Sequence, residues 1–137
     1  MTHVLFVCLG NSCRSQMAEA FARTYGSDVM TARSAGLAPA AYISPLTRTV
    51  MAEKNISLDD HFPKSLGEVE AGRFDLIVNM SGLSLPGSCG VPVRVWKIRD
   101  PMGAGEDVFR AVRDELEMRV MDLILELRRP RKRTSAS

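Results

Sequence analysis

The stretch Val4–Met17, VLFVCLGNSCRSQM, joins a short apolar run to a loop and to the start of a further element. Residues 3–8 are apolar and rich in valine without alternation, a pattern typical of a strand buried on both faces of a parallel sheet. The five residues between Cys8 and Arg14 are mostly small or polar and include a glycine, which favours a loop. From Met17 on, apolar side chains recur every four residues, so the loop is expected to lead into a helix.

Strands and helices alternate along the rest of the chain. Further strands are predicted over residues 28–34, 75–80 and within 91–98, and further helices over 45–54, 66–71 and after the GAGE loop at 103–106. The last helix carries an apolar stripe at spacings of three and four residues, formed by Phe109, Val112, Leu116, Val120, Leu123 and Leu127. This order predicts a single α/β domain with a central four-stranded parallel sheet, helices on both faces, and a phosphate-binding loop after the first strand.

Length and charge restrict the classes of protein that need to be considered. The 137 residues fit one domain, which we assign to 1–127, followed by a basic tail over 128–137 that we expect to be disordered. The tail holds five of the positive charges behind the net charge of +2, so the body has a charge of −3 and no nucleic-acid partner is expected. No apolar run reaches the roughly 20 residues that span a bilayer, and the N-terminus does not resemble a signal peptide. For the same reason no membrane partner is expected. Three cysteines do not form a disulfide framework, so we expect a cytoplasmic protein with reduced thiols.

The loop after the first strand has the composition of an anion site. A glycine-containing turn at a helix N-terminus directs several backbone N–H groups, and the positive end of the helix dipole, at one point. Arg14 adds a planar guanidinium suited to a tetrahedral oxyanion, and the positive potential favours the thiolate form of Cys8 as a nucleophile. A buried cysteine with an unrelated surface arginine is the alternative, but the strand before the loop and the helix after it favour the functional interpretation. The loop is not a Walker phosphate loop, since the G-K-[ST] ending is absent.

These residues resemble a known superfamily. The segment VLFVCLGNSCRSQMAEA, followed by SAG at 34–36, HFPKSL at 61–66 and the Asp100–Pro101 pair, resembles the low-molecular-weight protein tyrosine phosphatases, a superfamily that also contains thiol-dependent arsenate reductases. The resemblance runs from residue 4 to about residue 127. It implies a two-step reaction through Cys8 that needs no metal and no organic cofactor.

The resemblance also implies a role for each matching residue. Cys8 would be the nucleophile, Arg14 would hold the oxyanion together with the backbone N–H groups of residues 9–14, and Asp100 would be the general acid and then the base. Ser15 would hydrogen-bond the thiolate, and Asn11 would adopt a strained conformation that polar partners, Ser34 and His61, stabilise. The phosphate-binding loop would comprise Leu9, Gly10, Asn11, Ser12, Cys13 and Ser15.

Several assignments stay open at the level of sequence. Asp100 alone could be an ordinary Asp-Pro turn, in which case Asp59 or Asp60 would be the next candidates for the acid. Cys13 either traps an oxidised Cys8 as a disulfide or is a small buried residue that supports the loop. Tyr42 is a candidate wall of the substrate pocket and equally a lone surface aromatic.

The residues leave two enzymatic branches to compare. Ser12 and Gln16 resemble the arsenate reductase branch, whereas most phosphatases of the superfamily carry proline after the Arg-Ser pair. Thioredoxin-coupled reductases have two further cysteines after the third strand, where this chain has Met80 and Ser81 and only Cys89 remains as a possible redox thiol.

We therefore favour a phosphatase that hydrolyses a small phosphomonoester or protein phosphotyrosine and is inhibited by oxyanions such as phosphate. The alternative is an arsenate reductase that uses Cys8, a second thiol and a thioredoxin or glutathione system. A third possibility, a non-catalytic anion-binding module, would require neither a thiolate nor an acid.

Overall fold

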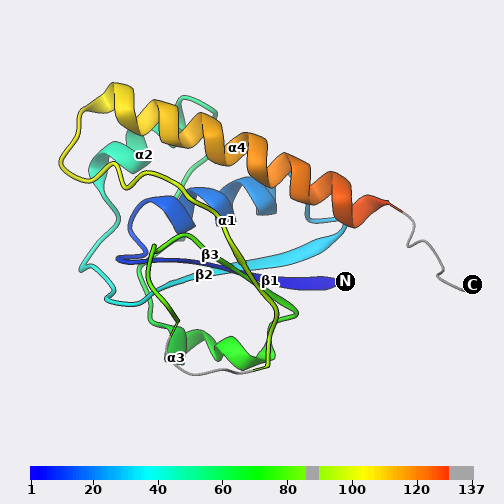
Figure 1. Ribbon diagram of the computed structural model, residues 1–137. Helices are drawn as coiled ribbons and strands as arrows, with labels where there is room; N and C mark the ends of the chain where they lie inside the picture. Colours follow the sequence, from blue (N-terminus) through cyan, green and yellow to red (C-terminus); the bar gives the residue numbers. More distant parts are fainter. Residues whose placement is uncertain (86–89, 130–137) are drawn as a thin grey trace, which may run out of the picture.

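A four-stranded parallel sheet forms the centre of the computed structural model, which describes residues 1–85 and 90–129 (Figure 1). The strands are β1 (Thr2–Cys8), β2 (Met30–Gly36), β3 (Leu76–Asn79) and β4 (Val93–Val95), in the spatial order β2-β1-β3-β4. The helices are α1 (Arg14–Tyr25), α2 (Pro45–Ala52), α3 (Leu66–Val69) and α4 (Glu106–Arg128), with a 3₁₀ turn η1 (Ala71–Arg73) after α3. The predicted α/β class, the strand count and the parallel direction are confirmed.

The first strand lies inside the sheet, as its unbroken apolar run predicts. Residues 4–7 of β1 have no exposed surface, because β1 pairs with β2 on one side and with β3 on the other. The register places Cys8 opposite Gly36 and Val7 opposite Asn79, so the carboxyl ends of all three strands lie at one edge of the sheet. Ligands bind at this edge in open parallel sheets, and the loop that follows β1 begins there.

Helices cover both faces of the sheet, as expected. Figure 1 shows α1, α2 and α4 on one face, where they enclose the larger core around Phe6, Phe21 and Leu116. On the opposite face, α3 and the η1 segment cover a smaller cluster. Its buried members are Leu5, Val7, Ala35 and Ile77. Alternate side chains of β1 therefore enter different cores, which explains why the strand shows no polar face.

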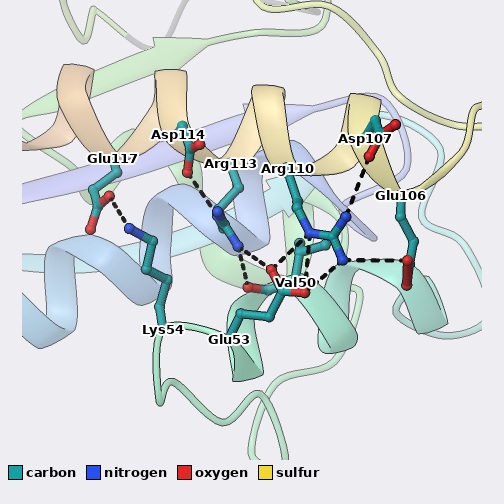
Figure 2. Close-up of polar contacts among 9 residues, drawn as sticks. All are labelled: Val50, Glu53, Lys54, Glu106, Asp107, Arg110, Arg113, Asp114 and Glu117. Atoms are coloured by element: carbon teal, nitrogen blue, oxygen red, sulfur yellow. Dashed lines mark hydrogen bonds and ion pairs between the residues drawn. The ribbon is translucent and has the colours of Figure 1, made fainter.

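The long helix α4 is attached to the body of the protein by its apolar stripe and by a charged cluster. All the predicted stripe positions are buried except Leu127, which is partly buried against the core. The charged cluster joins α4 to the end of α2 (Figure 2). Arg110 and Arg113 both bind the Glu53 carboxylate, at 2.8 and 2.6 Å, and Lys54 binds Glu117 at 3.0 Å. Hydrogen bonds from the two guanidinium groups lower the pKa of Glu53 to about 2.

The element boundaries differ from the sequence-based prediction where tertiary contacts determine them. β2 begins at Met30 rather than at residue 28, because the preceding residues form a turn in which the N–H groups of Val29 and Met30 both donate to the Gly26 carbonyl. α2 ends two residues early, and Asn55 then adopts a left-handed conformation with φ of 59°.

The end of the chain also differs from expectation. α4 includes Arg128, the first residue of the predicted tail, and this guanidinium binds Asp28 through two hydrogen bonds of 2.8 Å. Arg129 follows α4 as its C-cap residue, and the part of the expected tail from residue 130 on lies outside the described residues. Across residues 1–85 and 90–129, no helix combines the length and the apolar composition needed to cross a bilayer.

Candidate active site

The loop between β1 and α1 turns its carbonyl groups outward. The carbonyls of Cys8, Leu9, Gly10 and Ser12 accept hydrogen bonds of 2.8–3.2 Å from backbone N–H groups of the connection between β2 and α2. In a trans peptide the N–H group points opposite to the preceding carbonyl. The N–H groups that follow these carbonyls are therefore directed to the inside of the loop, beside the N-terminus of α1. This arrangement is an anion cradle, as the composition of the loop predicts.

The end of β2 packs closely against the cradle, and this contact requires a glycine. A Cβ atom on Gly36 would lie 2.8 Å from the carbonyl oxygen of Leu9 and 2.9 Å from both the backbone nitrogen and the Cβ atom of Asn11. These distances are shorter than the 3.5–4.0 Å of an ordinary contact between non-bonded carbon atoms. The glycine of the SAG segment therefore allows β2 and the cradle to approach each other.

The Cys8 thiol lies at the base of the cradle in contact with a hydroxyl group. Cys8 is 2 % exposed, and its Sγ atom is 2.9 Å from the Ser15 hydroxyl. The side-chain amide of Asn11 donates to the same Ser15 oxygen at 2.8 Å. Because that amide occupies an acceptor position of Ser15, the hydroxyl proton is available to a Cys8 thiolate. The structure therefore contains the expected contact between Ser15 and Cys8, and Asn11 has a positive φ of 50°.

Arg14 connects the cradle with two distant parts of the chain. Its Nη1 atom donates to the carbonyl oxygens of Met80 at 2.6 Å and Ile98 at 3.2 Å. Its Nη2 atom lies 3.6 Å from a carboxylate oxygen of Asp100. The structure therefore brings the predicted acid to the predicted anion-binding arginine. Asp100 is itself half-exposed and accepts a hydrogen bond of 3.0 Å from the Met102 N–H group, so its carboxylate is fixed and accessible.

The predicted support of Asn11 is wrong in its details. The side-chain oxygen of Asn11 accepts hydrogen bonds from the backbone N–H of Lys64 at 2.9 Å and from Gln16 at 3.1 Å. Ser34 instead donates to Glu19 at 2.5 Å, and the ring of His61 bonds the Gln16 side chain at 2.9 Å. His61 therefore reaches Asn11 only through Gln16, and Ser34 only through Lys64, whose ammonium donates to the Ser34 hydroxyl at 3.5 Å.

Three buried polar residues of the site were missed as supporting groups: Gln16, Glu19 and Lys64. Gln16 has no exposed surface and donates to the Asn11 and Phe62 carbonyls, each at 3.0 Å. The one available signal was local, since Gln16 and Glu19 are the polar residues of the segment 16–22, whose other residues are apolar or small. Polar residues in such a segment are either exposed or bonded to other buried groups, and only the structure distinguishes the two cases.

The remaining thiols differ from Cys8. Cys13 is buried, and burial raises the pKa of its thiol to about 12, so it stays protonated at neutral pH. Cys89 lies outside the described residues. Met80 is buried, and the Ser81 hydroxyl donates to the Asn79 side chain at 2.7 Å. Within residues 1–85 and 90–129, Cys8 is thus the cradle thiol that contacts the Ser15 hydroxyl, and no group of three or more His, Cys, Asp or Glu could hold a metal ion.

A cavity of about 850 Å³ opens beside Arg14, along β3 and β4. Its wall is mainly apolar and includes Leu83, Val93 and Val95, while Lys97 and Arg99 add positive charge to the same wall. Volumes of this size accommodate small ligands or a side chain of a partner. Tyr42, the other expected wall of the pocket, is 68 % exposed and is not among the residues that line this cavity.

Fold and site together define a parallel α/β sheet that carries a buried cysteine inside an anion cradle, at the carboxyl end of its first strand. The chain belongs to the low molecular weight phosphotyrosine protein phosphatase family, whose model matches residues 3–133. A glutaredoxin arsenate reductase from Synechocystis is 32 % identical over 137 residues, which cover 93 % of this chain and 99 % of that protein.

Solved structures also relate the chain to this superfamily. The structure described as an arsenate reductase in the phosphate binding state is 33 % identical, with a TM-score of 0.86 over 93 % of this chain and 99 % of that one. An arginine phosphatase from Geobacillus stearothermophilus is 26 % identical, with a TM-score of 0.83 over 93 % of each chain. The superfamily is thus confirmed, and the reductases among these relatives favour the alternative function over protein phosphatase activity.

Proposed function

We propose that this protein is an arsenate reductase with Cys8 as its nucleophile. The observation that carries the proposal is Gln16, the residue that stands where most phosphatases of the superfamily have proline. Its buried amide bonds Asn11, Phe62 and His61 at once, which proline could not do. The arsenate reductases among the relatives, including one that is 32 % identical, support the same branch.

The first step would use the cradle to hold arsenate, a tetrahedral oxyanion of the same shape as phosphate. The Cys8 thiolate attacks arsenic, an S–As bond forms, and one As–O bond breaks to release hydroxide, which leaves as water after it gains a proton. Arsenic keeps its +5 oxidation state in this adduct. Arg14 and the inward N–H groups balance the charge of the oxygens, while the Ser15 hydroxyl stabilises the thiolate before the attack.

The second step requires another thiol. That thiol attacks the sulfur of Cys8, the electron pair of the S–As bond passes to arsenic, and arsenite leaves in the +3 state while a disulfide forms. Cys13 is poorly suited to this attack, because burial raises the pKa of its thiol to about 12. The second thiol would therefore come from Cys89 or from a thioredoxin or glutathione system outside the chain.

Hydrolysis of phosphomonoesters, including protein phosphotyrosine, is the second candidate. The distance of 3.6 Å between Arg14 and Asp100 favours it, because that carboxylate is placed beside the cradle where a leaving oxygen would need a proton. A structural relative described as an arginine phosphatase supports phosphatase chemistry on this fold. Phosphate would inhibit either reaction by occupying the cradle.

The two candidates are tested by one pair of assays on the same reduced protein. Arsenite is measured after incubation with arsenate and either a thioredoxin or a glutathione system, and phenolate release is measured with a series of aryl phosphates. We expect arsenite formation that depends on Cys8 and is absent in Cys8→Ser. Turnover of aryl phosphates without arsenite formation in any thiol system would instead support the phosphatase.

A further inference from the structure

Two buried charges next to the cradle have no part in the chemistry described above. The side chains of Lys64 and Glu19 are only 5 % and 4 % exposed, and the ammonium nitrogen lies 3.8 Å from a carboxylate oxygen. Charged groups are rarely buried to this extent unless they are paired and hydrogen-bonded, so their location requires an explanation.

Polar groups surround both charges. The Lys64 ammonium donates to the Phe62 carbonyl at 3.2 Å and to the Ser34 hydroxyl at 3.5 Å. Glu19 accepts the Ser34 hydroxyl at 2.5 Å and binds Arg23 at 3.1 Å through its second oxygen. Burial lowers the pKa of Lys64, and the neighbouring Glu19 charge opposes this effect. The ammonium thus holds three parts of the chain together: α1, β2 and the segment before α3.

The backbone of the same segment is attached directly to the cradle. The Lys64 N–H group donates to the side-chain oxygen of Asn11 at 2.9 Å, and the Lys64 carbonyl accepts the Gly36 N–H at 2.8 Å. The Phe62 carbonyl, which the ammonium binds, also accepts the Gln16 amide at 3.0 Å. The side chain of Lys64 therefore binds the same backbone segment whose N–H group contacts Asn11.

Asn11 transmits this position to the nucleophile. Its φ of 50° lies in the left-handed region, which a non-glycine residue adopts only at a cost, so its side-chain contacts stabilise that conformation. From Asn11 the contacts continue to the Ser15 hydroxyl at 2.8 Å and from there to the Cys8 sulfur at 2.9 Å.

We propose that Lys64, neutralised by Glu19, is a positioning residue of the oxyanion cradle, because its ammonium fixes the 62–64 segment that holds Asn11 in place. This role does not depend on whether the enzyme reduces arsenate or hydrolyses a phosphomonoester. An ion pair that only adds to stability would not affect anion binding by the cradle. The two roles can therefore be distinguished by the affinity of the protein for inorganic phosphate.

The experiment compares Lys64→Met and Glu19→Gln/Lys64→Met with the native protein, and measures the dissociation constant of inorganic phosphate and the midpoint of urea unfolding. Lys64→Met removes the ammonium and leaves Glu19 buried beside Arg23 alone. We expect phosphate affinity to fall at least tenfold and stability to fall as well. The double variant removes the unpaired carboxylate, so its stability should partly recover while its phosphate affinity stays low.

Arg113→Met is the matched control, because Arg113 is also a buried cation, with a side chain that is 9 % exposed. It joins α4 to α2 through the Val50 carbonyl and the Glu53 carboxylate (Figure 2). The variant should lower stability and leave phosphate affinity unchanged. The proposal is overturned if phosphate affinity in Lys64→Met stays within twofold of native, or if the affinity recovers together with stability in the double variant. An equal loss of affinity in Arg113→Met would also overturn it. Since phosphate is the probe, a failure of arsenate reduction would not affect the result.

Discussion

Replacing Gly36 by alanine tests whether close packing of β2 determines the shape of the cradle. The added Cβ would lie 2.8–2.9 Å from three atoms: the Leu9 carbonyl oxygen, and the backbone nitrogen and Cβ of Asn11. Ordinary contacts are about 0.6–1.2 Å longer. Two of the three atoms belong to the backbone and the third is attached to it, so no side-chain rotation relieves the overlap, and the loop itself must move.

Overpacking of this kind costs about 1–3 kcal/mol of folding free energy. The displacement occurs at the residues that orient the inward N–H groups, so phosphate binding should weaken by on the order of tenfold or more, given that a shift of about 1 Å can reduce catalysis 10²-fold. Urea unfolding measures the first effect, and calorimetric titration with phosphate measures the second.

Gly67→Ala is the control for Gly36→Ala. Gly67 lies in α3, and the nearest atom to an added Cβ would be the Ser65 hydroxyl oxygen at 3.9 Å. This variant should keep native phosphate affinity and gain slightly in stability, because alanine favours the helix. Two results together would contradict this reasoning: a stability of Gly36→Ala within about 0.5 kcal/mol of native, half of the smallest overpacking cost, and a phosphate affinity within twofold of native. The close approach of β2 would then not shape the cradle.

Three further predictions concern single side chains. Asp100→Asn should lower the hydrolysis of any aryl phosphate that the enzyme accepts by about 10²–10⁴-fold for poor leaving groups; an equal loss for good and poor leaving groups would show that Asp100 is not the acid. Burial lowers the pKa of His61, so the unfolded chain, with an ordinary value of about 6.5, binds the proton more readily. Stability should therefore fall as the pH drops from 7 to 5, and urea unfolding of His61→Gln should show a smaller fall. Burial raises the pKa of Cys13 from 9.0 to about 12, so stability should decrease as the pH rises above 9, and Cys13→Ala should reduce that decrease. An unchanged pH dependence in either variant would contradict the corresponding assignment.

The parts of the fold that could be predicted are those that local patterns determine. The unbroken apolar run of β1, the small residues that follow it and the stripe of α4 each depend on neighbours in the sequence, and each is confirmed. The start of β2 was not predictable, because pairing with β1 and the turn at Gly26 determine it together.

The supporting contacts of the site could not be predicted for the same reason. Arg14 donates to Met80 and Ile98, which are 66 and 84 residues away in the sequence, and to carbonyl groups that carry no side-chain signal. Asn11 is oriented by the backbone of Lys64, so the identity of the side chain at 64 does not reveal that contact. A motif can therefore indicate a candidate nucleophile and a candidate anion-binding arginine, whereas the groups that hold them in place appear only when distant segments meet.

The most direct test of the proposed function is the fate of arsenate on the reduced protein. The native protein and Cys8→Ser are incubated with arsenate and a thioredoxin or glutathione system, and arsenite is quantified by chromatography with mass-spectrometric detection. We predict that the native protein forms arsenite catalytically with at least one thiol system and that Cys8→Ser forms none above background. The absence of arsenite with both thiol systems, from protein that binds phosphate normally, would contradict the assignment as an arsenate reductase.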